Sequence, residues 1–130
     1  MKTLRIKGIV FSGKGEAVKF VELPWVKKQI VEKLGFTPHS GTLNLKLDKE
    51  ELRHRYLLEK AEAIEISAIK GFSRGRCFKA MLVNNMECVI VIPEIPNYPE
   101  NVIEVIAPTN LREKLKLKDG DYVEIEILLE

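Results

Sequence analysis

Apolar and polar residues alternate along most of the chain, which is the spacing of half-buried β-strands. The segment around Asn84 and Asn85 has turn chemistry between two apolar runs and predicts a hairpin. So many strands within 130 residues favour a small closed barrel, because closure leaves no sheet edge exposed. The candidate strands are Leu4–Phe11, Glu16–Leu23, Gly41–Leu47, Glu62–Lys70, Arg76–Val83, Met86–Ile92, Val102–Ala107 and Tyr122–Leu129.

Three segments have helical spacing instead. The first begins at Pro24, continues with apolar residues three and four positions apart, and ends at Gly35. The second is short, Asn110–Leu115, and the Asn110 side chain is suited to capping its first turn. The third, Leu52–Lys60, has a weaker apolar pattern. The sequence therefore predicts a mainly β domain with two or three short helices.

Size and charge narrow the classes of function. The 130 residues suffice for one domain, which we take to span residues 1–130, and 45% of them are hydrophobic, as in soluble globular proteins. The 21 basic and 19 acidic residues give a formal net charge of +2, too even a balance for a protein that binds a nucleic-acid backbone. No segment approaches the ~18 apolar residues of a membrane span. We expect a cytoplasmic protein with neither nucleic acid nor membrane as partner, and we take it as a monomer.

The two cysteines, Cys77 and Cys88, are too few for a disulfide framework or a four-ligand zinc site. Both lie in apolar runs, so we expect buried free thiols. A domain of this size buries roughly two thirds of its unfolded surface, so its core closes without a cross-link or a structural metal.

The segment Gly8–Gly15 comes close to a phosphate-binding P-loop but departs from it twice. Gly15 stands where the motif needs a hydroxyl for magnesium, and the residues that follow alternate as in a strand instead of opening a long helix. We therefore reject a P-loop. The glycines of Ser12–Glu16 still fit either an ordinary hairpin turn or a nest of backbone amides that binds an anion, with Lys14 and Lys19 nearby.

One candidate strand, Gly41–Leu47, combines an apolar face with an unusual polar one. Because side chains alternate along a strand, its three leucines point into a core, while Thr42, Asn44 and Lys46 share the other face. Hydroxyl and amide oxygens are hard neutral ligands, which suit a Mg²⁺ ion whose charge is balanced by nucleotide phosphates. The same spacing also fits a polar face in contact with solvent, so both interpretations stay open.

Glu104 lies inside the apolar run Val102–Ala107, where an ionised carboxylate needs a partner or a ligand. The residue equally fits an outward position on an edge strand. Shortly after it, Thr109–Arg112 begins a helix, whose free amides suit an anion or the polar edge of a base. The Asp119-Gly120 turn and the strand after it are interpreted as structural.

Three segments in this order resemble the archaeal CTP-dependent riboflavin kinases: SGKGEAVKFVELPW, LGFTPHSGTLNLKLD and VIEVIAPTNLREKLKLKDGD. The resemblance extends from Gly8 to the last candidate strand, and residues 51–80 are its least distinctive part. It implies a six-stranded cradle-loop (RIFT-like) β-barrel, so the eight candidate strands would include extensions or pieces of one strand. It also implies phosphorylation of riboflavin by CTP, which gives FMN and CDP, with Mg²⁺ as the cofactor.

The resemblance assigns site residues position by position. Its magnesium ligands fall on Thr42 and Asn44, and its flavin-contacting glutamate falls on Glu104. It assigns no catalytic base that we can identify. The nucleotide-binding residues fall on Lys14, Gly15, Glu16, Ala17, Val18, Lys19, Thr109, Asn110, Leu111 and Arg112.

Two positions depart from the family pattern. A threonine that contacts flavin in the family corresponds to Pro96, which has neither a hydroxyl nor a backbone N–H. Either neighbouring Asn97 or Tyr98 substitutes for it, or flavin affinity is lower. A glycine of the nucleotide loop is replaced by Ala17, a small change that a strand position tolerates.

Two non-catalytic functions remain as alternatives, because one fold serves many functions. A DNA-binding regulator of similar barrel type would need a basic face and an affinity that falls steeply with salt, which the near-neutral charge does not favour. A flavin-storage protein would bind FMN without any turnover that depends on CTP.

Overall fold

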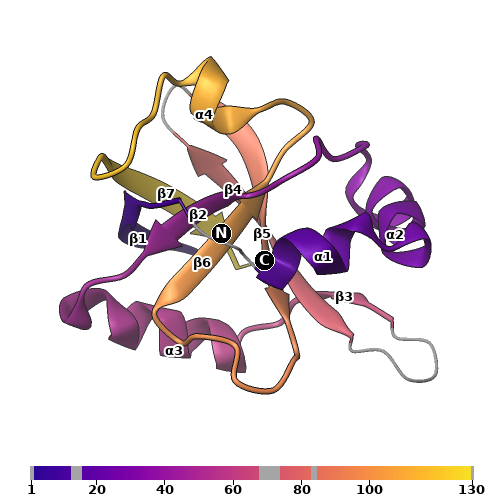
Figure 1. Ribbon diagram of the computed structural model, residues 1–130. Coiled ribbons are helices and arrows are strands. Elements are labelled where there is room, and N and C mark those ends of the chain that lie inside the picture. Colours follow the sequence, from indigo (N-terminus) through magenta and orange to yellow (C-terminus); the bar gives the residue numbers. More distant parts are fainter. Residues whose placement is uncertain (1, 13–15, 68–73, 83–84, 130) are drawn as a thin grey trace.

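The computed structural model describes residues 2–12, 16–67, 74–82 and 85–129. Within these residues, antiparallel strands form one continuous sheet, with helices around it (Figure 1). The strands are β1 (Thr3–Val10), β2 (Leu43–Lys46), β3 (Ile64–Ile66), β4 (Gly75–Leu82), β5 (Met86–Pro93), β6 (Val102–Ile106) and β7 (Tyr122–Leu128). The helices are α1 (Glu16–Glu22), α2 (Pro24–Leu34), α3 (Leu52–Lys60) and α4 (Leu111–Lys114), with a 3₁₀ turn η1 (Lys49–Glu51) before α3. In the described ranges, none of these helices has the length and apolar character that crossing a bilayer requires.

The sheet closes on itself through β4. The strands follow the order β3-β4-β5-β6-β2-β1-β7, and β4 pairs with β7 as well as with β5. Six strands therefore form a closed barrel, and β3 is an extension that pairs with β4 outside the ring. The predicted six-stranded barrel is confirmed, as is the expectation that the candidate strands include segments outside it.

Several local predictions are confirmed by the structure. Strands β4 and β5 pair along their whole length as the predicted hairpin, although residues 83–84 of its turn lie outside the described part. Helix α2 begins at Pro24 and ends at Gly35, whose φ of 82° is the left-handed conformation that glycine adopts easily. The Asn110 side chain caps α4 by accepting a hydrogen bond from the Glu113 amide at 3.2 Å.

The predicted strand Glu16–Leu23 is wrong, because Glu16–Glu22 form helix α1. Phe20 and Val21 are sequence neighbours and both are buried in one cluster, which a helix allows but the alternating sides of a strand do not. Apolar residues of this segment also recur three and four positions apart, so the pattern fits either structure. Contact with β4 fixes the helix: a Cβ on Gly75 would lie only 2.6 Å from Cζ of Phe20.

Two further candidate strands are shorter than predicted. Within Glu62–Lys70 the described strand is β3, while residues 68–70 lie outside the described part. Gly41–Leu47 contributes β2 alone, so Thr42 precedes the strand instead of lying in it. The three leucines of this segment are buried as predicted.

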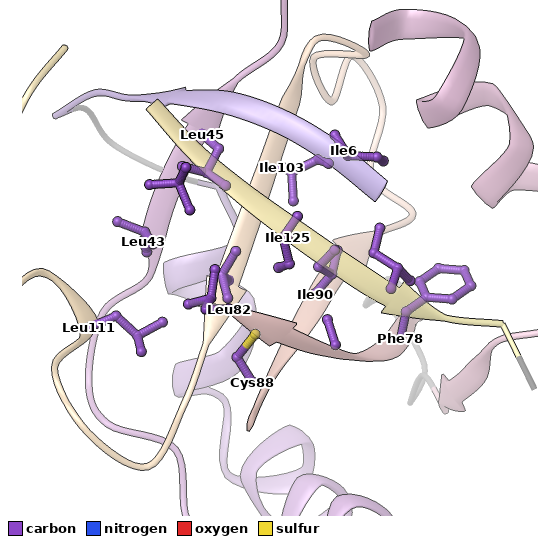
Figure 2. Close-up of a cluster of buried hydrophobic side chains, with 14 of the residues drawn as sticks. Ile6, Leu43, Leu45, Phe78, Leu82, Cys88, Ile90, Ile103, Leu111 and Ile125 are labelled. Atoms are coloured by element: carbon purple, nitrogen blue, oxygen red, sulfur yellow. The ribbon is translucent and has the colours of Figure 1, made fainter. Parts of the chain in front are cut away.

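Two apolar clusters occupy opposite sides of the barrel wall. The inner cluster fills the barrel and includes Ile6, Leu45, Phe78 and Ile125 (Figure 2). The outer cluster joins α1 and α2 to the outward residues of β4, β5 and β6. Each fully buried aliphatic side chain stabilises the fold by roughly 1.5–3 kcal/mol relative to an exposed one. Successive residues along these strands therefore pack into different clusters, one inside the barrel and one outside it.

Both cysteines are free and buried, as expected. Cys88 belongs to the inner cluster, and Cys77 belongs to the outer one. Burial raises the pKa of each thiol to about 12, so neither is ionised to any extent at neutral pH.

Candidate functional site

Three side-chain oxygens converge where β2 meets β6. Asn44 and Glu104 are directly opposite each other in the register of these two strands. The Thr42 hydroxyl lies 2.8 Å from Oδ1 of Asn44 and 2.9 Å from Oε1 of Glu104. Because a hydroxyl carries one proton, Thr42 donates to one of these two oxygens at a time. The result is a compact cluster of hard oxygen atoms from three residues.

Burial decides between the alternative interpretations of these residues. Asn44 is 6% exposed and Glu104 is fully buried. Strand β6 lies between β5 and β2, so Glu104 is on an interior strand of the sheet and not on an edge. The solvent-facing interpretation of Asn44 and the edge-strand interpretation of Glu104 are therefore wrong, whereas Lys46 is exposed. Glu104 does face outward from the barrel, because its neighbours Ile103 and Val105 belong to the inner cluster, but it is covered.

A tyrosine completes the surroundings of the Glu104 carboxylate. The Tyr98 hydroxyl donates to Oε2 of Glu104 at 2.6 Å, so each carboxylate oxygen has a hydroxyl within hydrogen-bond distance. This length is typical of a hydroxyl that donates to a carboxylate. Tyr98 lies two residues after Pro96, and the structure thus brings a phenol to Glu104 in the loop where the family pattern has a threonine.

A second polar network, of Ser12, Arg112 and Asp119, links three segments that are far apart in the sequence. The Arg112 guanidinium lies 2.9 Å from Oδ1 of Asp119 and donates to the Ser12 hydroxyl at 3.0 Å. Ser12 in turn donates to the same Asp119 oxygen at 2.8 Å. The hydrogen bond from Ser12, together with Arg112, holds the pKa of the Asp119 carboxyl below its usual value. The start of the glycine-containing loop is therefore fixed beside the start of α4.

A cavity of about 140 Å³ lies between Thr42, a member of the oxygen cluster, and this second region. Thr42 and its neighbours line one side, and the segment 109–112 lines the other. Two of the sequence-predicted segments, the metal-ligand segment and the second nucleotide segment, thus face the same space. Arg112 belongs both to this lining and to the network with Ser12.

The first nucleotide segment is only partly described. Lys14 and Gly15 lie outside the described residues. Residues 16–19 form the start of α1 and not a loop, and the Lys19 side chain is exposed. Of the described residues at the start of this segment, Ser12 lies within hydrogen-bond distance of Arg112, one of the predicted nucleotide contacts. Sequence reasoning treated Ser12 as a loop residue only, because its partners Arg112 and Asp119 are 100 or more positions away.

The segment that holds this site matches a known family and several known enzymes. Residues 10–127 match the family model named CTP-dep_RFKase, described as "Domain of unknown function DUF120". The riboflavin kinase of Archaeoglobus fulgidus is 46% identical over 131 residues, which cover 98% of this chain and 56% of that protein. The riboflavin kinase of Pyrobaculum aerophilum is 45% identical over 134 residues, which cover 98% of this chain and 62% of that protein.

The relatives differ in length. The chain spans little more than half of the A. fulgidus protein, whereas it covers 98% of the riboflavin kinase of Sulfurisphaera tokodaii, with 41% identity over 133 residues. The family match covers most of the chain and includes Thr42, Asn44, Glu104 and Arg112. The chain belongs to the CTP-dependent riboflavin kinase family.

Proposed function

We propose that the protein phosphorylates the 5′-hydroxyl of riboflavin with CTP as the donor, which gives FMN and CDP. The observation that carries this proposal is the oxygen cluster of Thr42, Asn44 and Glu104, whose member Thr42 lines a cavity that is also lined by Arg112. Phosphoryl transfer depends mainly on positioning and on neutralising charge, and an oxygen cluster beside a guanidinium supplies groups for both. The names of the relatives support riboflavin as acceptor, and the name of the family model supports CTP as donor.

The donor set of the cluster fits Mg²⁺. The described residues contain no group of three or more His, Cys, Asp and Glu side chains that could hold a metal. The hydroxyl of Thr42 and the amide oxygen of Asn44 are instead hard neutral donors, as Mg²⁺ accepts when phosphates and water complete its shell. When bound, the ion neutralises charge on the transferred phosphoryl group. We propose Thr42 and Asn44 as the residues that hold it.

Glu104 is proposed to orient the acceptor. Its carboxylate is fully buried and is fixed by the hydroxyls of Thr42 and Tyr98. A carboxylate held in this way accepts a hydrogen bond from a ribityl hydroxyl without a change of rotamer, which favours a single pose of the acceptor.

The nucleotide is proposed to lie between Ser12 and the segment 109–112. Arg112 offers a planar guanidinium, whose donors match phosphate oxygens. Its ion pair with Asp119 holds this side chain at the mouth of the cavity that Thr42 lines. The phosphates would thus approach the oxygen cluster from the α4 side.

The test is an incubation of the purified protein with riboflavin, Mg²⁺ and each of the four ribonucleoside triphosphates in turn, with FMN resolved by chromatography. We expect FMN with CTP and stoichiometric CDP. FMN with none of the four would refute the kinase, and tight flavin binding in the same sample would then point to storage. FMN with ATP alone would refute the choice of donor.

A further inference from the structure

The Thr42 hydroxyl has two acceptors within reach and one proton to give. Its oxygen lies 2.8 Å from Oδ1 of Asn44 and 2.9 Å from Oε1 of Glu104, so both distances allow a hydrogen bond. One proton satisfies one of these two oxygens at a time. The position of this proton therefore decides whether Thr42 holds Asn44 or Glu104.

A cation on the proposed pair of ligands would remove this choice. Adjacent ligands of an octahedral Mg²⁺, each about 2.0–2.1 Å from the ion, are roughly 2.8–3.0 Å apart. The 2.8 Å between the oxygens of Thr42 and Asn44 matches that spacing, so the two side chains fit one ion where they stand. The positive charge turns the hydroxyl proton away from the ion and its second ligand, and Oε1 of Glu104 is then the acceptor.

Glu104 is held as a fixed acceptor for that proton. The register of β2 and β6, which lie side by side in Figure 1, sets Glu104 directly opposite Asn44. The carboxylate is fully buried, and the Tyr98 hydroxyl donates to its Oε2 at 2.6 Å, which keeps Oε1 directed at Thr42. A metal ligand that donates to a carboxylate gains basicity and a fixed orientation, and loss of such a partner weakens metal binding roughly 10–100-fold.

The same carboxylate is the group proposed to orient the acceptor. A hydroxyl fixed at each of its two oxygens leaves it a single orientation, which is the condition for holding a ribityl hydroxyl in one pose. The ion thus lowers the cost of ordering the acceptor. By thermodynamic linkage, the acceptor strengthens binding of the ion by the same factor.

We propose that Glu104 is a positioning residue for the metal site: its carboxylate takes the Thr42 proton when Mg²⁺ is bound, and this hydrogen bond makes the ion and the acceptor alcohol bind cooperatively. The proposal rests on the proposed function, because it takes Thr42 and Asn44 as the ligands and riboflavin as the acceptor. It adds that Glu104 raises the affinity for an ion that it does not itself bind.

The first experiment measures affinity for Mn²⁺, which replaces Mg²⁺ as a spectroscopic probe. The protein carries one equivalent of CDP, which supplies phosphates without the γ-phosphoryl group, and electron paramagnetic resonance follows the unbound ion. The variants are Glu104→Gln and, as the matched control, Glu87→Gln at an exposed position of β5. We expect Glu104→Gln to weaken Mn²⁺ binding about tenfold or more and Glu87→Gln to leave it unchanged. Wild-type affinity in Glu104→Gln would overturn the proposal.

A double-mutant cycle separates this hydrogen bond from direct coordination by Glu104 and from simple attraction between its charge and the ion. Thr42→Val keeps the shape of the side chain but has no proton to orient. In this background Glu104→Gln should cost much less Mn²⁺ affinity than it does in the wild type, because the two residues act through one hydrogen bond. An equal loss in both backgrounds would show that Glu104 acts on the ion directly and would overturn the proposal.

Thr42→Ser is the conservative variant, since it keeps the hydroxyl. In the serine background Glu104→Gln should again weaken Mn²⁺ binding about tenfold or more. A serine that behaves like valine in the cycle would contradict the role of the hydroxyl. Circular dichroism and thermal unfolding show which variants retain the fold.

A measurement on the wild type needs no substitution and stays decisive where a variant does not fold. The Mn²⁺ affinity of the CDP complex is determined with and without saturating riboflavin. We expect riboflavin to raise this affinity at least about fivefold, the lower end of the usual range for coupled sites. Equal affinities would overturn the proposal.

The kinase assay keeps the two proposals apart. FMN formation from CTP by a wild type whose Mn²⁺ affinity does not respond to riboflavin would overturn the coupling and leave the kinase intact. Cooperative binding of Mn²⁺ and riboflavin that depends on Glu104, in a protein that forms no FMN with any triphosphate, would refute the kinase and support the coupling.

Discussion

The polar side chains of the oxygen cluster are held by hydrogen bonds inside a mostly apolar wall. Leaving a buried polar group without a partner costs roughly 1–3 kcal/mol, and the hydroxyls of Thr42 and Tyr98 offset that cost for the carboxylate of Glu104. A substitution here therefore changes chemistry and stability together. Tests of single residues need a measurement of each.

Asn44→Ala is expected to lower FMN turnover by at least about 100-fold, because it removes a proposed ligand of Mg²⁺. The ion, when bound, would neutralise charge on the transferred phosphoryl group. Steady-state kinetics with CTP and riboflavin measure the effect. Circular dichroism and thermal unfolding show whether the barrel remains folded.

Lys46→Ala is the control for this substitution, since Lys46 is exposed on the same strand two residues further on. We expect near wild-type turnover for it. Near wild-type turnover for Asn44→Ala would contradict the metal role of Asn44.

Asp119→Asn is expected to reduce stability at neutral pH and to have no effect in acid. The pKa of the Asp119 carboxyl is held low in the folded protein, chiefly by the hydrogen bond from Ser12. Its contribution is thus present above the ordinary pKa of about 3.9 and is lost as the pH falls through the lowered value. The check is the difference in melting temperature between wild type and variant from pH 7 down to pH 2. A difference that stays constant over this range would contradict the assignment.

The stability of helix α1 depends on its packing against the outer face of the barrel. Its Phe20 ring lies on β4 at Gly75, where the absence of a side chain makes room for it. The helix also packs against α2 and β5. The segment has few residues with which to form a helix alone, so contact with the sheet stabilises it.

Gly75→Ala is expected to destabilise the protein by about 1–3 kcal/mol, because the new Cβ would overlap the Phe20 ring. Urea unfolding measures the change in free energy. In a Phe20→Ala background the same substitution should cost much less, so a double-mutant cycle should show coupling between the two positions. Equal costs in both backgrounds would contradict this packing.

The sequence predicts which residues are near neighbours better than it predicts which of them are buried. Alternation on Gly41–Leu47 predicts that Thr42 and Asn44 are neighbours, and they are hydrogen-bonded although Thr42 precedes the strand, because residues two positions apart lie close whatever the distant pairing. The burial of Glu104 depends instead on β6 lying between β5 and β2, which is a long-range pairing. Alternation failed for Glu16–Leu23 because the same apolar residues fit a helix that needs the outer face of the barrel.

At the scale of the whole molecule, the barrel wall couples its two cores. Strands β4 and β5 carry residues of the inner and the outer cluster in alternation. Neither cluster can come apart without breaking the hydrogen bonds between these two strands. Cys88 and Cys77 are natural reporters, since one lies in each cluster.

We expect both thiols to react with a thiol reagent at one common rate, that of global unfolding. Burial and a pKa of about 12 keep each thiol unreactive in the folded barrel at pH 8. Quenched labelling followed by peptide mass spectrometry gives the two rates. Faster labelling of Cys77 would show that the outer layer opens independently.

The network of Ser12, Arg112 and Asp119 has a consequence for the order of folding. Ser12 is 100 positions from Arg112 and 107 from Asp119, and β1 must pair with β7 to bring them together. Contacts so distant along the chain form late, because closing the intervening loop is entropically costly. The hairpin of β4 and β5 can assemble early, whereas the proposed nucleotide site exists only after the ring has closed. Affinity for CTP would therefore be the last property that a refolding molecule regains.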